Sequence, residues 1–263
     1  MRIAVVQLNS QTDKDANVAQ ALDFVHRAAA DGAELIALPE MFAWCGPLQD
    51  APDHAEPIPG PTTNAVADLA RQSGVYVLAG SVHERVEGQD RPFNTSALID
   101  RDGTIVARYR KIHLFDVQGL DMESPYVQPG TEPVVATVRR RRFGLSICYD
   151  LRFPELYREL SARGAEVIFA PSAFTLHTGR DHWEVLIRAR AIENLAYVVA
   201  PDQWGPHPPD KHCYGHSMIV DPWGTVLCRL PDTPGYAIAN VDPARVAQVR
   251  ANLPALNHRR IAT

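Results

Sequence analysis

Three separated residues of reactive type, a glutamate, a lysine and a cysteine, each come at the end of a short apolar run. Glu40 closes ELIALPE, Lys111 follows VARYR, and Cys148 follows FGLSI. In open α/β sheets, ligands collect beyond the carboxyl ends of the strands, because side chains there leave the packed sheet while the backbone still holds them rigidly. The shared position at predicted strand ends therefore indicates one site built from all three residues.

Together these residue types could hydrolyse a substrate with a carbonyl or nitrile carbon. The thiolate form of a cysteine is the nucleophile, and a nearby base such as Glu40 could take the proton of the Cys148 thiol. As the thiolate attacks, negative charge develops on the substrate heteroatom, where Lys111 and the backbone N–H of Tyr149 could stabilise it. The pattern predicts nucleophilic catalysis through a covalent intermediate.

Each of the three residues also has a simpler interpretation when it is taken alone. Cysteine is among the residue types most often buried, so Cys148 could be a core residue. Most glutamate and lysine side chains face solvent, so Glu40 and Lys111 could be surface residues. A non-catalytic dimeric scaffold is the alternative of a different class, because fold and motif do not by themselves prove turnover.

The composition is that of an ordinary folded protein, with 46% apolar and 22% charged residues in 263. One α/β domain can reach this length, and no linker or repeat divides the chain, so we predict a single domain over residues 1–263. The net charge of -5 argues against nucleic-acid and anionic-lipid partners. The basic run Arg139–Arg142 lies between two short apolar runs, where a solvated hairpin turn is expected.

The expected compartment is the cytoplasm. The opening MRIAVVQLNS carries no recognisable secretory signal, and no apolar stretch reaches the roughly 18 residues that a membrane span needs. The four cysteines have no regular spacing, so we expect free thiols rather than disulfides in a reducing compartment. These cysteines are Cys45, Cys148, Cys213 and Cys228.

The elements that must position the site alternate between strands and helices, with hairpins in the middle and near the end of the chain. Mixed alternation plus hairpins predicts an α/β fold with two packed mixed sheets and outer helices. Helices are expected over Lys14–Ala30, Pro61–Ser73, Pro154–Arg163, Arg180–Asn194 and Pro243–Asn252. Strands are expected over Ile3–Leu8, Glu34–Glu40, Val75–Ser81, Glu166–Ala170 and Ala196–Pro201, and hairpins over Asn94–Lys111, Val134–Cys148 and Ser217–Val241.

Two further groups of residues could serve another purpose, one as metal ligands and the other as a packing or subunit-contact face. The segment Pro206–His216 is rich in metal-ligand types, but its spacing matches no familiar zinc pattern, so an ordinary proline-rich surface loop is the alternative and no metal is predicted. The segment His182–Asn194 places apolar side chains on one helical face, which indicates packing or subunit contact. The ligand types are His207, Asp210, His212, Cys213 and His216, and the apolar face is Trp183, Leu186, Ile187 and Ala191.

The words LPEMF around Glu40, YRKIHLFD around Lys111 and GLSICYDLRFPEL around Cys148 resemble, in this order, the nitrilase superfamily of carbon-nitrogen hydrolases. The resemblance implies a four-layer αββα sandwich that dimerises through its sheets, and a Glu-Lys-Cys triad that uses no cofactor. By that match Cys148 is the nucleophile, Glu40 the general base and Lys111 the electrostatic partner. Glu123 in DMESPY is similar to a second glutamate of the family, which would orient Lys111 and the substrate.

Within the superfamily, the stretches FAPSAFTLHTGRDHWEVLIRARAIEN, YGHSMIVDPWG and LPALNHRR resemble the branch that holds deaminated glutathione amidase and omega-amidase. This likeness implies metabolite repair by a homodimer or higher homo-oligomer whose substrate is a small carboxylate-bearing amide. Deaminated glutathione is expected first, with 2-oxoglutaramate or 2-oxosuccinamate as the omega-amidase alternative. A nitrilase or a carbamoyl-amide hydrolase would use the same triad with different pocket walls.

Three further residues are candidates for binding the substrate. Arg152 could meet a substrate carboxylate bidentately, although a structural ion pair with Asp150 or Glu155 is the alternative. Phe174 and Thr175 are expected to face the site if the family geometry holds.

The segment before Glu123 departs from the family pattern. QGLDM, at residues 118–122, is shorter than is usual in this branch. That loop borders the pocket in the family, so its length bears on where Glu123 lies and on how long a substrate fits.

Overall fold

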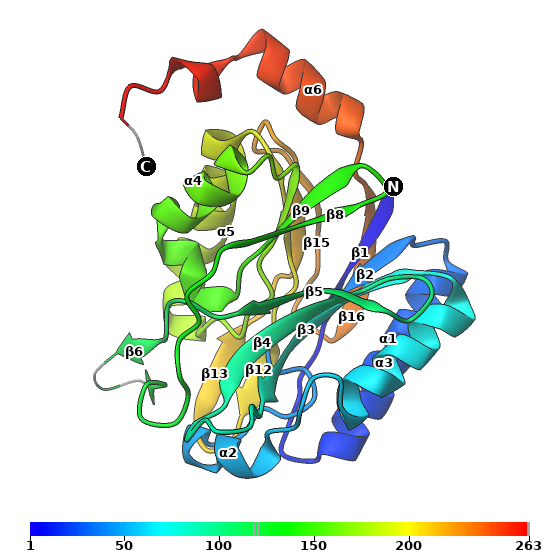
Figure 1. Ribbon diagram of the computed structural model, residues 1–263, viewed down its shortest axis with the longest axis vertical. Coiled ribbons are helices and arrows are strands. Elements are labelled where there is room, and N and C mark those ends of the chain that lie inside the picture. The colour runs from blue at the N-terminus through cyan, green and yellow to red at the C-terminus, as the bar shows by residue number, and fades with distance from the viewer. Residues whose placement is uncertain (118, 120, 262–263) are drawn as a thin grey trace.

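The computed structural model describes residues 1–261 except 118 and 120, and in this part of the chain two six-stranded sheets pack face to face (Figure 1). One sheet has the strand order β16-β1-β2-β3-β4-β5, and the other has the order β15-β14-β11-β10-β9-β8. Helices α1 and α3 lie on the outer side of the first sheet, and α4 and α5 on the outer side of the second (Figure 1). The predicted αββα sandwich is confirmed.

The elements have the following bounds. The first sheet comprises β1 (Arg2–Gln7), β2 (Leu35–Ala37), β3 (Tyr76–Glu84), β4 (Phe93–Ile99), β5 (Ile105–Arg110) and β16 (Gly235–Asn240). The second comprises β8 (Val134–Val138), β9 (Arg141–Leu145), β10 (Val167–Phe169), β11 (Tyr197–Ala200), β14 (Met218–Val220) and β15 (Val226–Arg229). Short pairs are formed by β6 (Asp116–Val117) with β7 (Asp121–Met122), and by β12 (Trp204–His207) with β13 (Lys211–Tyr214). The helices are α1 (Lys14–Ala30), α2 (Ala51–His54), α3 (Pro61–Ser73), α4 (Pro154–Ala162), α5 (Leu176–Asn194) and α6 (Pro243–Asn252).

Strand β1 illustrates how the layers are built. Successive side chains of a strand point to opposite faces of the sheet. Ile3 and Val5 accordingly join the core between the sheets, whereas Ala4 and Val6 join the core beneath α1 and α3. A strand buried on both faces reads as a continuous apolar run, which is why IAVV shows no polar alternation. The ends of such strands are rigid places from which to hold a site.

Most predicted elements are found with close boundaries, and three helices are found with the predicted bounds, Lys14–Ala30, Pro61–Ser73 and Pro243–Asn252. The helix expected from Arg180 begins earlier, at Leu176. Gly179 weakens the local helical signal, since glycine has a poor helix propensity. A Cβ there would come within 2.3 Å of Tyr214, so the close contact with the neighbouring β13 accounts for a glycine at this position.

Two predicted strands are shorter than expected, and both corrections bear on the site. Strand β2 ends at Ala37, so Glu40 lies in the loop beyond it. Strand β9 ends at Leu145, and Cys148 opens a 3-10 turn, Cys148–Arg152, instead of closing the strand. The apolar run continues past the last sheet residue in both cases because the following loop is itself buried.

The first two residues of the arginine run, Arg139 and Arg140, form the predicted turn between β8 and β9, whereas Arg141 and Arg142 are the first residues of β9. Arg139 and Arg140 have φ angles of 49° and 66°, the left-handed conformations of a tight hairpin turn. None of the four cysteines, all of which the structure describes, forms a disulfide. No α-helix of the described residues combines the length and apolarity needed to cross a membrane.

His207, at the end of β12, is a buried histidine whose protonation makes the free energy of unfolding depend on pH. Its Nδ1 donates to the carbonyl oxygen of Ser10 at 2.7 Å, while its Nε2 has no partner among the described residues. Burial lowers the pKa of His207 to about 4. The folded protein therefore holds this imidazole in the neutral form at pH values where the unfolded chain protonates it.

We predict that the stabilising effect of His207 declines as the pH falls from about 6.5 to about 4, because only the unfolded state gains a proton in that window. The loss should approach about 3 kcal/mol in the free energy of unfolding. Urea unfolding of the wild type and of His207→Gln at pH 7 and pH 4 measures it, since glutamine does not titrate. A difference between the two proteins that is the same at both pH values would contradict the prediction.

Candidate active site

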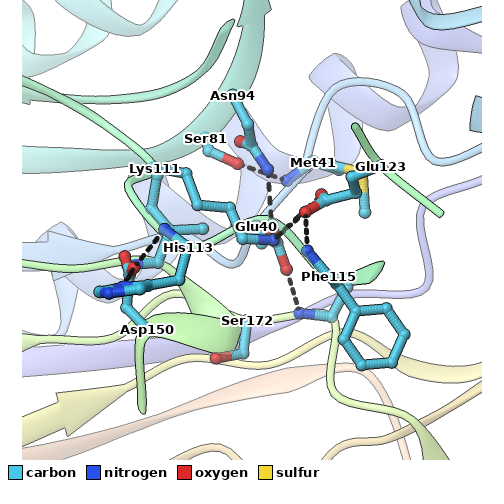
Figure 2. Close-up of polar contacts among 12 residues, drawn as sticks. Glu40, Met41, Ser81, Asn94, Lys111, His113, Phe115, Glu123, Asp150 and Ser172 are labelled. Atoms are coloured by element: carbon cyan, nitrogen blue, oxygen red, sulfur yellow. Dashed lines mark hydrogen bonds and ion pairs between the residues drawn. The ribbon is translucent and has the colours of Figure 1, made fainter. Parts of the chain in front are cut away.

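Glu40 is a buried carboxylate in the loop after β2, and both of its oxygens are bonded. Oε1 accepts from Asn94 Nδ2 at 2.9 Å and from Lys111 Nζ at 3.0 Å, and Oε2 accepts from the Ala173 N–H at 2.8 Å (Figure 2). Asn94 belongs to β4 of the first sheet, whereas Ala173 follows β10 of the second. The side chain of Glu40 is therefore held from both sheets at once.

Lys111 directly follows β5 and is 1% exposed, and its ammonium lies between two carboxylates. Nζ is 3.0 Å from Glu40 Oε1 and 2.8 Å from Glu123 Oε2. Figure 2 shows the ammonium between the two carboxylates. Burial by itself lowers the pKa of Lys111, but Glu123 and Glu40 outweigh it and hold the pKa well above its usual value. A charged lysine is thus fixed in a dry site, where an ammonium needs such partners.

Glu123 reaches Lys111 in spite of the short segment before it. Its Oε2 also accepts from the Phe115 N–H at 2.6 Å, and its carbonyl oxygen accepts from the Tyr126 and Val127 N–H groups. Residues 118 and 120 of the shortened segment lie outside the described residues. The described backbone on both sides of that segment fixes Glu123 against the lysine.

Cys148 sits at a sharp turn whose backbone is held from two sides. Its φ of 46° is left-handed, a conformation that costs on the order of 1–3 kcal/mol for a residue with a Cβ and that persists only where the surroundings enforce it. The Cys148 N–H donates to Pro171 O at 2.9 Å, and the Ile147 N–H donates to Asp150 Oδ2 at 2.8 Å. The turn places the thiol, 8% exposed, in the cavity lined by Glu40, Lys111 and Glu123.

The thiol of Cys148 is protonated at rest. Burial raises its pKa well above the usual range and Glu40 raises it further, while Lys111 and the Ala173 N–H act in the opposite direction. A thiol in this state is a poor nucleophile, because the thiolate is the attacking form. Reaction at Cys148 therefore needs a base that takes the proton as the new bond forms.

Asp150 joins the lysine segment to the cysteine turn, a role that the sequence analysis missed. This fully buried carboxylate accepts from the Tyr109 hydroxyl at 2.6 Å. It also accepts from the His113 N–H at 3.0 Å and lies 2.7 Å from His113 Nδ1, and Figure 2 shows these two residues in contact. Tyr109 and His113 flank Lys111, while the bond from Ile147 holds the turn before Cys148. The feature of the sequence that could have indicated this role is the position of Asp150, two residues after the predicted nucleophile Cys148.

The remaining predicted site residues Tyr149, Arg152, Phe174 and Thr175 line the same cavity. The guanidinium of Arg152 lies 5.0 Å from the ring centre of Phe174, and its Nη1 lies 3.3 Å from His182 Nδ1. No ion pair joins Arg152 to Asp150 or Glu155 among the contacts of the described residues, so that alternative was wrong. The arginine faces the cavity with its charge available to an anionic substrate.

The segment Pro206–His216 is a β-hairpin and not the irregular surface loop that was the expected alternative. It falls on the hairpin β12–β13, whose Tyr214 N–H donates to Phe174 O at 2.8 Å. Lys211, His212 and Cys213 thereby become part of the cavity wall. Within the described ranges, no three histidine, cysteine or acidic side chains group closely enough to hold a metal ion. The sequence showed these residue types but not which cavity the hairpin would line.

Comparison with known proteins shows the family of the chain. Residues 2–251 match the carbon-nitrogen hydrolase family. The chain belongs to this family. The resemblance to the nitrilase superfamily seen in the three motifs is confirmed.

Similar proteins cover almost the whole chain. The deaminated glutathione amidase of Synechocystis sp. is 44% identical over 97% of this chain and 97% of its own length. The crystal structure of the C. elegans NitFhit protein matches with a TM-score of 0.92 and 39% identity over 98% of this chain and 65% of that chain. An amidase from Nesterenkonia sp. AN1, in a glutamate-to-glutamine mutant carrying the acetamide moiety of fluoroacetamide at its active-site cysteine, matches with a TM-score of 0.82 and 28% identity over 97% of this chain and 95% of its own.

We predict that Asp150→Asn lowers kcat on the order of 100-fold on any amide that the wild type hydrolyses, with little change in KM. An amide nitrogen cannot accept the bonds that one carboxylate oxygen accepts from Tyr109 and Ile147, so Lys111 and Cys148 lose their common anchor. Steady-state kinetics measure the effect. Tyr109→Phe, which removes one of these bonds, is the matched control and should lose less. If Asp150→Asn had the kcat of the wild type and only a lower melting temperature, Asp150 would stabilise the fold without positioning the reactive residues, and the prediction would be contradicted.

Proposed function

We propose that this chain is a single-domain cysteine amidase that hydrolyses deaminated glutathione through a thioester at Cys148. The observation that carries the proposal is the buried ammonium of Lys111 between Glu40 and Glu123 in the cavity that also contains the Cys148 thiol. Relatives named deaminated glutathione amidase, from 40% to 44% identical over nearly the full chain, support this choice of substrate.

In the first step the amide carbon is attacked by the Cys148 sulfur. Because the thiol is protonated at rest, its proton passes to Glu40 as the carbon-sulfur bond forms. Charge then develops on the amide oxygen, where Lys111 Nζ and the Tyr149 N–H stabilise it. Glu123 holds Lys111 in place for this task.

In the second step the carbon-nitrogen bond breaks. Glu40 returns its proton to the departing nitrogen, and the acyl group stays on Cys148 as a thioester. Water then attacks the thioester with Glu40 again as the base, and the tetrahedral adduct releases the carboxylic acid and the thiol. These reaction steps balance with the amide and one water molecule as the only reactants, so the proposed mechanism uses no cofactor.

Deaminated glutathione and 2-oxoglutaramate would give the same acyl group on Cys148. The first releases the dipeptide cysteinylglycine, and the second, the omega-amidase substrate, releases ammonia. We infer that Arg152 binds the carboxylate of the shared 2-oxoglutaryl group, because Arg152 lines the cavity together with Phe174 and Thr175. 2-Oxosuccinamate would bind in the same way with a shorter chain.

We predict that Cys148→Ala, Glu40→Gln and Lys111→Met each lower kcat/KM for deaminated glutathione by about four powers of ten, and that the losses do not add in double variants because the residues act as one unit. Release of cysteinylglycine measures the rate. Cys228→Ala is the control, since it removes a half-buried thiol on β15 away from the cavity. Equal inactivity of the wild type and Cys148→Ala on a broad amide panel would favour the non-catalytic scaffold.

We also propose that the protein is a cytoplasmic homodimer that pairs through the outer face of α5. Val185 and Ile192, 66% and 45% exposed, lie two turns apart on this helix, and Trp223, 57% exposed, lies on the adjacent turn between β14 and β15. Arg188 Nε donates to Gly224 O at 2.9 Å and holds that turn against the helix. Large apolar side chains gathered in this way favour a protein partner over solvent.

We predict that Val185→Glu lowers the molar mass measured by light scattering from that of a dimer to that of a monomer, because a buried unpaired carboxylate opposes association. Val106→Glu, at an exposed valine of β5, is the matched control and should leave the mass unchanged. A wild type that is monomeric, or a Val185→Glu variant that stays dimeric, would contradict this interface.

A further inference from the structure

The cavity around Cys148 continues into a wider groove. The inner part, about 60 Å³, holds the reactive side chains, and the outer part has a volume of about 820 Å³. Leu48, Phe115, Thr175 and Lys211 line both parts, so the groove is the way into the inner cavity. A substrate longer than its reacting amide and acyl chain must extend into the groove.

Two cations from different elements face this outer groove. Arg180 comes from the second turn of α5, and Lys211 comes from the start of β13. The side chain of Arg180 makes no hydrogen bond or ion pair with the described residues. Asp210 contributes the one carboxylate among the described residues that line the groove, against the two cations Arg180 and Lys211.

The position of these cations is fixed by the fold. The hairpin that carries Lys211 is tied to the chain after β1, because Asn9 Nδ2 donates to Trp204 O and His207 Nδ1 donates to Ser10 O. On its other side Cys213 pairs with Thr175, the residue that caps the start of α5. Lys211 and the first turns of α5 are therefore held on either side of the same groove.

The two candidate substrates differ in a group that Arg180 and Lys211 could bind. Both deliver the same 2-oxoglutaryl group to Cys148, so an acyl-binding residue such as Arg152 cannot distinguish them. They differ only in the departing amine, which is ammonia in one and a dipeptide ending in a carboxylate in the other. A site that selects the longer substrate must contact that dipeptide outside the inner cavity.

We propose that the outer groove binds the terminal carboxylate of a peptide-like leaving group, with Arg180 and Lys211 as the residues that determine specificity. The proposal rests on the amidase function proposed above. Leu48, Phe115 and Met122 line the route between and contact the body of the dipeptide. Contacts of this kind stabilise the complex before acylation and are gone once the dipeptide departs.

The test compares kcat/KM for deaminated glutathione and for 2-oxoglutaramate in Arg180→Gln, Lys211→Gln and the double variant. For deaminated glutathione we expect a loss of about fivefold in each single variant and on the order of 20-fold in the double variant, mainly through KM. For 2-oxoglutaramate we expect the wild-type value in Arg180→Gln, and in the two variants that change Lys211, which also borders the inner cavity, a loss clearly smaller than the loss on deaminated glutathione. Arg180→Lys and Lys211→Arg keep the charge and should retain most of the activity on the longer substrate.

A second substrate measures how much the terminal carboxylate of the dipeptide contributes to binding. Deaminated glutathione with its glycine carboxylate converted to a primary amide should be a poorer substrate for the wild type by about the same 20-fold. The double variant should hydrolyse the two forms equally well. Arg108→Gln, an exposed arginine of β5 outside the groove, controls for the change in net charge.

The outcomes separate this inference from the function on which it rests. Wild-type values for the double variant with deaminated glutathione, or equal losses on both substrates, would overturn the assignment of Arg180 and Lys211 while the amidase function stands. A wild type that hydrolyses neither substrate would overturn the proposed function and this inference together.

Discussion

The site depends on one buried ammonium held between two carboxylates. An unpaired charge in a dry interior is strongly destabilising, so Lys111 requires both Glu40 and Glu123 in contact with it. Each carboxylate is in turn fixed by backbone N–H groups, from Ala173 and Phe115. Ala173 follows a strand of the second sheet, whereas Asn94 lies on a strand of the first sheet and Lys111 directly follows another. The charge network therefore depends on how the two sheets are packed against each other.

This network also sets the chemistry available to the thiol. One cation and two anions leave an excess of negative charge beside Cys148, which together with burial favours the neutral thiol. A free thiolate is therefore not the resting form, and the mechanism proposed above couples attack on a substrate to proton transfer to Glu40. In that mechanism Lys111 stabilises the charge that moves to the substrate oxygen once Glu40 is neutral.

The sequence allowed the layers and the three reactive residues to be predicted, because long helices and doubly buried strands leave strong periodic signals. Glu40, Lys111 and Cys148 stood out since each ended such a run. Asp150 and Lys211 were missed for different physical reasons. The bonds of Asp150 join segments about forty residues apart, and the cavity wall at Lys211 depends on how a short hairpin packs against α5. Local patterns carry no information about contacts of that range.

The central claim of this account is a covalent thioester formed at Cys148 by the buried charge network. Acid quenching of the wild type during turnover of deaminated glutathione, followed by peptide mapping with mass spectrometry, tests it most directly. The account predicts a 2-oxoglutaryl group on the peptide that contains Cys148 and on none that contains Cys45, Cys213 or Cys228. Consumption of the substrate with the Cys148 peptide unmodified at every quench time would contradict it.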